Sequence, residues 1–328
     1  MNTARMELHQ RIPLDVPFSI HVFPSYYCNF RCSYCLHALS DSVLEKKGFR
    51  RQLMELSTFE KTVDDAKMFA HPIKALIFAG HGEPLIHKNI AEMVAYAKQS
   101  GCFERVEIVT NGFLLTKELS DRLIDAGLDR LRVSLQGLSA QAYQETSGVD
   151  IDFEQFRDNL AYFYQRKTKT EVYIKIIDIA LKQPEETERF YELFRPISDI
   201  AAVEYAIPFV NEIDYSSLGK LSEKNKQGHM GRSNVCSMPF YMLVVAPNGD
   251  VLPCCATDVP LVFGNVRRTC LKDVWNSTMR KEFLCKQLHG ASEVPVCNMC
   301  SVPSYGLQQG DYLDGYEDEL LERIGNQL

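Results

Sequence analysis

The chain has little that would suit it to a membrane or to a nucleic-acid surface. No apolar run in its 328 residues approaches the roughly 20 residues that cross a bilayer. Acidic residues outnumber basic ones, giving a net charge of −7, whereas nucleic-acid binding requires a basic face. Residues 1–17 are polar and lack the apolar stretch of a signal peptide. We therefore expect a cytoplasmic protein with neither a membrane nor a nucleic acid as its partner.

Cysteine, by contrast, is abundant, with 11 residues in the chain. Disulfides are rare in the cytoplasm, and clustered cysteines there favour metal ligation. One group is Cys28, Cys32 and Cys35, and a second consists of the cysteines at 236, 254, 255, 297 and 300. Those at 102, 270 and 285 stand apart and are expected to be small buried hydrophobes. Because iron–sulfur clusters normally take four thiolates, the first group predicts a metal centre with an open coordination site.

The first two-thirds of the chain alternates apolar strand-like segments with amphipathic helical ones. We expect strands at 19–23, 75–79, 106–109, 130–135, 172–180 and 202–207, and helices at 58–69, 90–99, 117–126, 153–166 and 185–194. The strands are continuously apolar, as in a parallel sheet covered by helices. Six such units are fewer than the eight of a full barrel. The pattern therefore predicts an α/β fold, specifically a partial (β/α)6 TIM barrel.

The last third of the chain has a different character. Residues 211–235 are polar and aperiodic, and we interpret them as a linker. Beyond them, two short apolar runs flank Asn248-Gly249, which predicts a β-hairpin, and residues 271–287 are expected to form a helix. The expected division is an N-terminal extension (1–17), the barrel (18–210), the linker (211–235), a small hairpin-plus-helix iron–sulfur domain (236–303) and a C-terminal tail (304–328).

Polar and glycine-rich motifs follow the predicted strands, where barrel folds place their sites. Gly80-His81-Gly82-Glu83-Pro84 follows the second strand, Thr110-Asn111-Gly112 follows the third, and Ser134 lies near the end of the fourth. Glycines let the backbone approach a ligand closely, and a carboxylate such as Glu83 accepts strong hydrogen bonds from an ammonium group. Each motif taken singly is more often an ordinary turn. Their common position at strand ends predicts one shared site.

The spacing Cys28-x3-Cys32-x2-Cys35, with Tyr34 before the last cysteine, resembles that of the radical SAM superfamily. The strand-end motifs occur in that family's order, with His81 at a position that commonly holds glycine or threonine. The resemblance implies that the three thiolates hold a [4Fe–4S] cluster whose fourth iron binds S-adenosylmethionine (SAM). It also implies a set of SAM contacts: Tyr34, Gly82, Glu83, Asn111, Ser134 and Lys175. For Lys175, a solvated position at the strand edge is the alternative.

Four cysteines of the second group resemble the ligand set of a twitch domain, the shortened form of the SPASM domain of some radical SAM enzymes. The resemblance implies one auxiliary [4Fe–4S] cluster, saturated by its four thiolates, Cys236, Cys254, Cys297 and Cys300. A structural zinc site with the same ligands is the alternative. The neighbouring Cys255 is expected to be a bystander. It could instead replace Cys254 as a ligand or donate a hydrogen atom to a substrate radical.

The domain layout is similar to that of 2-deoxy-scyllo-inosamine dehydrogenases. It implies an oxidoreductase in which a 5′-deoxyadenosyl radical abstracts hydrogen from a sugar- or cyclitol-like small molecule and the auxiliary cluster takes up an electron. A peptide-modifying enzyme or epimerase with Cys255 as hydrogen donor is the alternative, although 17 residues before Phe18 are too few for a peptide-recognition domain. An alternative of another class is a non-catalytic zinc- or cluster-binding protein. We expect a flavodoxin or ferredoxin as electron donor.

Overall fold

The computed structural model describes residues 7–216, 232–305, 307–308 and 310–326. Within these ranges one nine-stranded sheet has the strand order β6-β5-β4-β3-β2-β1-β7-β8-β9. Its strands are β1 (Ser19–Val22), β2 (Ala75–Phe78), β3 (Val106–Thr110), β4 (Arg130–Leu135), β5 (Glu171–Ile177), β6 (Ile200–Glu204), β7 (Met242–Val245), β8 (Asp250–Leu252) and β9 (Gly264–Asn265). The first six run parallel, each beside the next in the chain, which confirms the predicted partial barrel.

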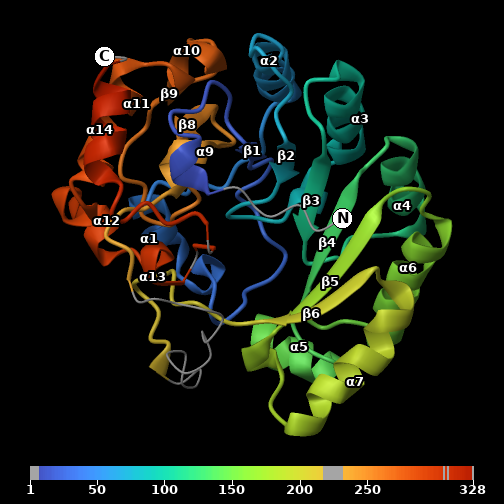
Figure 1. Cartoon of the computed structure of the whole chain (residues 1–328). Coiled ribbons are helices and arrows are strands. Elements are labelled where there is room, and N and C mark those ends of the chain that lie inside the picture. The colour runs from blue at the N-terminus through green and yellow to red at the C-terminus, as the bar shows by residue number, and fades with distance from the viewer. Residues whose placement is uncertain (1–6, 217–231, 306, 309, 327–328) are drawn as a thin grey trace.

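Helices cover the outer face of this sheet, and α2, α3, α4, α6 and α7 lie along it in chain order (Figure 1). The helices are α1 (Asp41–Lys46), α2 (Leu56–Ala66), α3 (Ile90–Ser100), α4 (Lys117–Asp125), α5 (Ala140–Ser147), α6 (Phe153–Arg166), α7 (Pro184–Phe194), α9 (Met238–Tyr241), α10 (Leu271–Trp275), α11 (Thr278–Leu288), α12 (Pro295–Met299), α13 (Val302–Tyr305) and α14 (Glu317–Gly325). The C-terminal helices α10 to α14 lie on the opposite side of the molecule from α6 and α7 (Figure 1).

The strands differ from the expected pattern in one respect. Along β4 and β5, buried residues alternate strictly with half-buried ones. The buried members, such as Val133 and Ile174, belong to the main hydrophobic core. The intervening positions include Arg132, Ser134 and Lys175, which are only half-buried. An open partial barrel leaves its concave side accessible, so the residues there need not be apolar.

Several predicted element boundaries differ from the structure, among them that of the sixth strand, which spans Ile200–Glu204 rather than 202–207. Two further differences have an identifiable cause. The fifth strand ends at Ile177, because Asp178–Ala180 forms a 3-10 turn and Asp178 accepts a hydrogen bond from the backbone N–H of Ala206 at 2.9 Å. The single helix expected at 271–287 is two helices, α10 and α11. Ser277 separates them, since its hydroxyl accepts a hydrogen bond from the N–H of Arg280 and thereby caps the start of α11.

The predicted hairpin is present, but it belongs to the barrel sheet. Strands β7 and β8 pair antiparallel, and Gly249 at the turn has a φ of +87°, a conformation that favours glycine. On its other side β7 pairs in parallel with β1, in the register Ser19 with Met242. The hairpin therefore extends the sheet past its first strand. Of the predicted linker, residues 217–231 lie outside the described residues.

The beginning and the end of the described chain pack against each other. Leu8 and Ile12 share a small hydrophobic cluster with Leu320 and Ile324 of α14. The Arg323 guanidinium donates hydrogen bonds to the backbone carbonyls of residues 9 and 12, at 2.9 and 3.1 Å. These contacts attach the N-terminal segment to the C-terminal tail.

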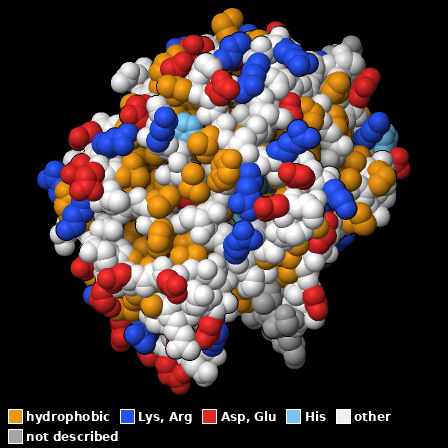
Figure 2. All heavy atoms as spheres, turned by 180° about the vertical axis from the view of Figure 1, so that it is seen from behind, with side chains coloured by type: hydrophobic (Ala, Val, Ile, Leu, Met, Phe, Trp, Pro, Cys, Tyr) orange, Lys and Arg blue, Asp and Glu red, His pale blue; other side chains and the backbone are white. Residues whose placement is uncertain are grey.

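Charged side chains of both signs lie on the surface. On the face opposite to that of Figure 1, acidic and basic side chains are interspersed, with hydrophobic side chains between them (Figure 2). Among the described residues, no helix is both long enough and apolar enough to cross a bilayer.

Candidate functional site

The first cysteine group lies in the loop that follows β1. Burial and the neighbouring thiols raise the pKa of Cys32 well above its ordinary value, since Cys35 and Cys28 both lie close to it. The loop is held to the end of α5, because the N–H groups of Arg31 and Ser33 donate to the carbonyls of residues 147 and 146, at 2.9 and 3.0 Å. The structure therefore brings the three predicted thiols together on a fixed loop.

Glu83 organises the two loops beside this group. Its Oε1 accepts hydrogen bonds from the N–H of Leu85 at 2.9 Å and from the Thr110 hydroxyl at 2.6 Å, and its Oε2 accepts one from the N–H of Asn111 at 2.8 Å. Burial nevertheless raises the pKa of this carboxyl to about 7. The Asn111 amide in turn donates to Asn29 Oδ1 at 2.8 Å, within the cysteine loop. Because a carboxylate has about four acceptor positions, Glu83 retains capacity for one further donor.

Gly82 allows an unusually close approach of two backbone segments. A Cβ atom at this position would lie 2.1 Å from the carbonyl oxygen of Ser25. Because that oxygen belongs to the backbone, no rotation of a side chain could relieve the clash. Next to it, the N–H of Glu83 donates to the carbonyl of Tyr27 at 2.8 Å. The glycine therefore brings the Gly80–Pro84 loop against the chain that leads to Cys28.

A pocket at the end of the barrel gathers three of the predicted SAM contacts. It is lined by Tyr34, Ser134 and Lys175, together with Gln136 and Glu204, which the motifs had not indicated. The Tyr34 hydroxyl donates to Gln136, whose amide nitrogen donates to the Ser134 carbonyl at 3.2 Å. Residues that sequence reasoning had assigned to three separate elements thus face one space.

Lys175 has a partner that neither sequence interpretation included. Its ammonium lies 2.5 Å from Glu204 Oε2, and the Tyr173 hydroxyl donates to Glu204 Oε1 at 2.7 Å. Although burial opposes the effect, Lys175 holds the pKa of the Glu204 carboxyl below its ordinary value. Glu204 is the one charged residue in the predicted sixth strand, but nothing in the sequence indicates that Lys175 is its partner.

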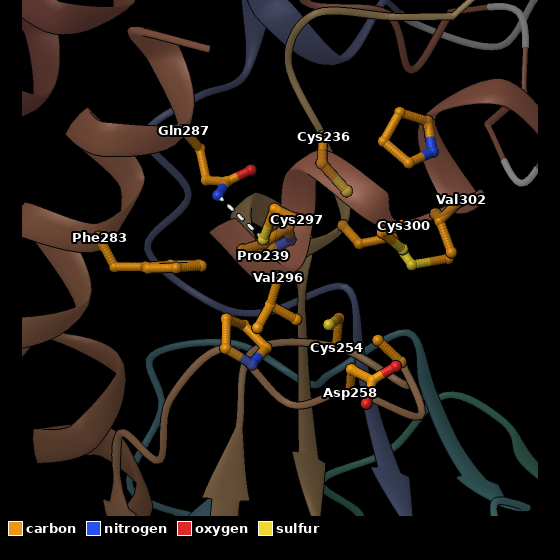
Figure 3. A pocket seen from close by; sticks show the side chains of 14 residues that line it. Cys236, Pro239, Cys254, Asp258, Phe283, Gln287, Val296, Cys297, Cys300 and Val302 are labelled. Carbon is orange, nitrogen blue, oxygen red and sulfur yellow. Dashed lines mark hydrogen bonds between the residues drawn. The ribbon is translucent and has the colours of Figure 1, made fainter. Parts of the chain in front are cut away.

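Four cysteines of the second group surround a pocket of their own. Cys236 precedes α9, Cys254 follows β8, and Cys297 and Cys300 lie in and just after α12. All four line the same pocket and are drawn around it in Figure 3. Burial raises the pKa of Cys236 well above its ordinary value, and the three other thiols add to the effect because they are near.

Side chains from other segments hold α12 and its cysteines in place. The Arg232 guanidinium donates to the carbonyls of Cys297, Asn298 and Cys300, at 3.0, 2.8 and 2.7 Å. The Gln287 amide donates to the Cys297 sulfur at 3.4 Å (Figure 3). Arg232 thus binds three carbonyls at the end of α12, where the Cys297 carbonyl also accepts a hydrogen bond from the N–H of Cys300 at 3.2 Å.

The donor set around this pocket suits a cluster. The other lining residues of the pocket include Pro239, Phe283, Val296 and Val302. Four thiols in apolar surroundings match the ligand set of a [4Fe–4S] cluster. In the described part of the chain, no group of three or more His, Cys, Asp or Glu side chains is placed so that it could hold a single metal ion.

Cys254 and Cys255 face different spaces, although they are adjacent in the chain. Cys255 is not among the residues that line the four-thiol pocket; it lines a second cavity, with Ile207, Phe209 and Thr257. Its sulfur lies 3.5 Å from His21 Nδ1, on β1. The outlying cysteines differ as well: Cys102 is buried as expected, whereas those at 270 and 285 are half-buried.

This second cavity adjoins two other pockets. It shares Ile207 and Phe209 with the pocket of Tyr34 and Lys175. It also shares Asp258 and Cys300 with the four-thiol pocket. A series of adjoining spaces therefore runs from Tyr34, in the loop of the first cysteine group, to Cys300 of the second.

Comparison with known families agrees with this arrangement. Residues 22–194 match the radical SAM superfamily, and residues 236–301 match SPASM, an iron–sulfur cluster-binding domain. Since the first match alone spans more than half of the chain, the protein belongs to the radical SAM superfamily. Its cofactors are accordingly SAM, a SAM-binding [4Fe–4S] cluster and an auxiliary iron–sulfur cluster.

Several curated relatives show how diverse this superfamily is. The chain is 29% identical over 220 residues to dTDP-4-amino-4,6-dideoxy-D-glucose ammonia-lyase of Streptomyces venezuelae, covering 64% of this chain and 43% of that enzyme. It is 35% identical over 139 residues to GTP 3′,8-cyclase of Staphylococcus haemolyticus, covering 41% and 38%. The matched region thus spans less than half the length of either relative. An AdoMet-dependent heme synthase of Methanosarcina barkeri is 24% identical over 340 residues, covering 88% and 91%.

Solved structures share the fold over most of the chain. BtrN in complex with AdoMet and 2-DOIA superposes with a TM-score of 0.57 at 19% identity, covering 90% of this chain and 98% of BtrN. SuiB of Streptococcus suis bound to S-adenosylmethionine gives a TM-score of 0.61 at 17% identity, covering 93% and 78%. BtrN is a 2-deoxy-scyllo-inosamine dehydrogenase, so the predicted layout is confirmed at the level of the fold.

Proposed function

We propose that this protein is a cytoplasmic radical SAM oxidoreductase acting on a sugar- or cyclitol-like small molecule. Cys28, Cys32 and Cys35 hold the SAM-binding cluster in this proposal, and the four-thiol pocket holds the auxiliary one. When bound, the first cluster supplies the electron that cleaves SAM to a 5′-deoxyadenosyl radical, and the second supplies an electron acceptor. A flavodoxin or ferredoxin provides the initial electron.

The cavity that adjoins both the pocket of Tyr34 and Lys175 and the four-thiol pocket is the observation that supports this proposal. A substrate there would contact the Tyr34 and Lys175 side on one hand and the Asp258 and Cys300 side on the other. The cavity wall also includes Asn211 and Thr257, which suit a molecule rich in hydroxyl or amino groups. A substrate held in this way lies between the source of the radical and the electron acceptor.

The names of two relatives support the same substrate class. The ammonia-lyase of S. venezuelae is named for an amino sugar nucleotide, and BtrN was solved with 2-DOIA. In the oxidation that we propose, the substrate carbon loses a hydrogen atom to the 5′-deoxyadenosyl radical. The hydroxyl on that carbon then loses its proton, one electron passes to the acceptor, and a carbonyl group forms.

Anaerobic reconstitution tests the proposal directly. The protein should carry about eight irons per chain, the content of two four-iron clusters, and should form 5′-deoxyadenosine from SAM and dithionite. Cys32→Ala should abolish SAM cleavage, whereas Cys297→Ala should retain it and stop carbonyl formation from a panel of aminocyclitols and nucleotide-linked amino sugars. A colourless, zinc-loaded protein, or a loaded protein that makes no 5′-deoxyadenosine, would instead identify a non-catalytic metal-binding protein.

The position of Cys255 favours a second candidate, epimerisation. Its thiol faces the cavity rather than the four-thiol pocket. In this reaction the Cys255 S–H bond breaks, its hydrogen atom forms a C–H bond on the substrate radical, and a thiyl radical remains. One electron from the low-potential donor and one proton from water restore the thiol. Turnover in D2O separates the candidates, because an epimer would carry deuterium on the reacting carbon and an oxidation product would not.

A peptide substrate is the other form of this candidate. SuiB, which shares the fold, was solved bound to its precursor peptide SuiA. Incubation with short peptides in place of sugars, under the same D2O conditions, is the corresponding experiment.

A further inference from the structure

The segment that carries Cys254 and Cys255 is attached to the barrel along its length. We call residues 254–258 the auxiliary loop. Each residue after Cys254 contacts a different part of the barrel. The Cys255 sulfur lies 3.5 Å from His21 Nδ1, and the Ala256 carbonyl lies 3.3 Å from His81 Nε2. The Thr257 hydroxyl donates to the Phe209 carbonyl at 2.9 Å, and Asp258 pairs with Lys47 and accepts a hydrogen bond from the Asn211 amide at 3.0 Å. A loop with so many attachments responds to displacement of the barrel's own loops.

Among these contacts, that of His81 comes from the loop that contains Gly82 and Glu83. The His81 side chain is buried, and its ring packs edge-on against Phe23 and Phe49, with centroid distances of 5.2 and 4.8 Å. The two aromatic rings fix the imidazole, so Nε2 is directed at the Ala256 carbonyl. Burial lowers the pKa of His81 to about 4, so the ring is neutral at physiological pH.

The rest of the Gly80–Pro84 loop is equally constrained. The His81 carbonyl accepts a hydrogen bond from His37 Nε2 at 3.0 Å, and Glu83 holds the loop to Thr110 and Asn111. The loop can therefore move only together with its neighbours. A glycine at position 81 would possess no side chain to reach the auxiliary loop.

We propose that His81 is a positioning residue through which the Gly80–Pro84 loop holds the auxiliary loop, so that SAM binding in the barrel orders the chain beside the second cysteine group. The proposal rests on the proposed function, because it assumes that SAM contacts the Gly80–Pro84 loop. Its consequence is that the site of radical formation and the segment carrying Cys254 and Cys255 are ordered in a single event.

Hydrogen–deuterium exchange of the anaerobic, iron-loaded protein tests this proposal, with SAM as the probe. In the wild type, SAM should slow exchange of peptides covering the auxiliary loop by about threefold. His81→Phe keeps an aromatic ring between Phe23 and Phe49 but has no donor for the Ala256 carbonyl. This variant should lose the SAM-dependent slowing, and His81→Gln, whose amide is a donor, should restore part of it.

A matched control is available close by in the sequence. His87 is also buried, and its Nε2 lies 2.8 Å from the Met54 carbonyl, away from the auxiliary loop. His87→Phe should keep the SAM-dependent slowing. If His81→Phe does not load with iron, His81→Leu serves as the second donor-free variant.

The proposal is overturned if SAM slows exchange equally in the wild type and the donor-free variants, or if it has no effect on the auxiliary loop of the wild type. Formation of 5′-deoxyadenosine is measured in the same samples. A wild type that shows the slowing but cleaves no SAM would refute the proposed function and leave the role of His81 standing. A wild type that cleaves SAM but shows no SAM-dependent slowing of exchange would refute the role of His81 and leave the proposed function standing.

Discussion

Replacement by alanine should lower the iron content of the protein at Cys254 but not at Cys255. Cys254 lines the four-thiol pocket with three other cysteines, whereas Cys255 lines the neighbouring cavity. Cys254→Ala leaves three thiols where a closed cluster requires four, so the iron content should fall from about eight to about four per chain. Cys255→Ala removes no ligand and should leave the content at about eight.

The assay is iron and sulfide determination after anaerobic reconstitution, with 5′-deoxyadenosine formation measured in parallel. Both variants should still cleave SAM, because neither alters the triplet loop. Cys285→Ala is the matched control, since Cys285 is half-buried and belongs to neither cysteine group. Loss of iron in Cys255→Ala, together with full loading of Cys254→Ala, would refute the assignment of ligands from the two cavities.

Three further predictions concern the loops around the triplet. The Glu83 carboxyl has a pKa of about 7 in the folded chain against an ordinary 4.5, so the folded state holds the proton more tightly. The free energy of unfolding should therefore fall by about 3 kcal/mol as pH rises from below 4.5 to above 7, and Glu83→Gln should flatten this dependence in urea titrations. Gly82→Ala places a Cβ against the Ser25 carbonyl oxygen and should weaken SAM binding about tenfold, measured by anaerobic equilibrium dialysis. Lys47→Met removes the cationic partner of Asp258 and Glu212, whose side chains are 31% and 39% exposed, and should lower the free energy of unfolding by only about 1 kcal/mol in the same urea titrations, because solvent screens both carboxylates. A loss several times larger would contradict this screening.

The sequence was sufficient for features whose signal is local. The order of strands and helices in the barrel follows from apolar periodicity, and the hairpin follows from Asn248-Gly249. The thiol triplet lies within one short loop, so its convergence was readable from spacing alone. In each case the residues that determine the feature are neighbours in the chain.

Features that depend on distant contacts were not readable. Lys175 gave no indication that it pairs with Glu204, because the two meet only when β5 and β6 lie side by side. The different orientations of Cys254 and Cys255 depend on how the auxiliary loop rests on the barrel. The position of His81 between Phe23 and Phe49 likewise arises from chain segments that are far apart in the sequence.

The parallel pairing of β7 with β1 has a consequence for how this protein can be divided. Strand β1 is hydrogen-bonded on both sides, to β2 and to β7, so the barrel has no free edge at its first strand. A fragment ending before Cys236 would expose the backbone N–H and C=O groups of β1 along that edge. Unpaired edges of this kind recruit strands from other molecules. We expect such a fragment to aggregate, since the C-terminal segment covers the edge as well as supplying the second group of cysteines.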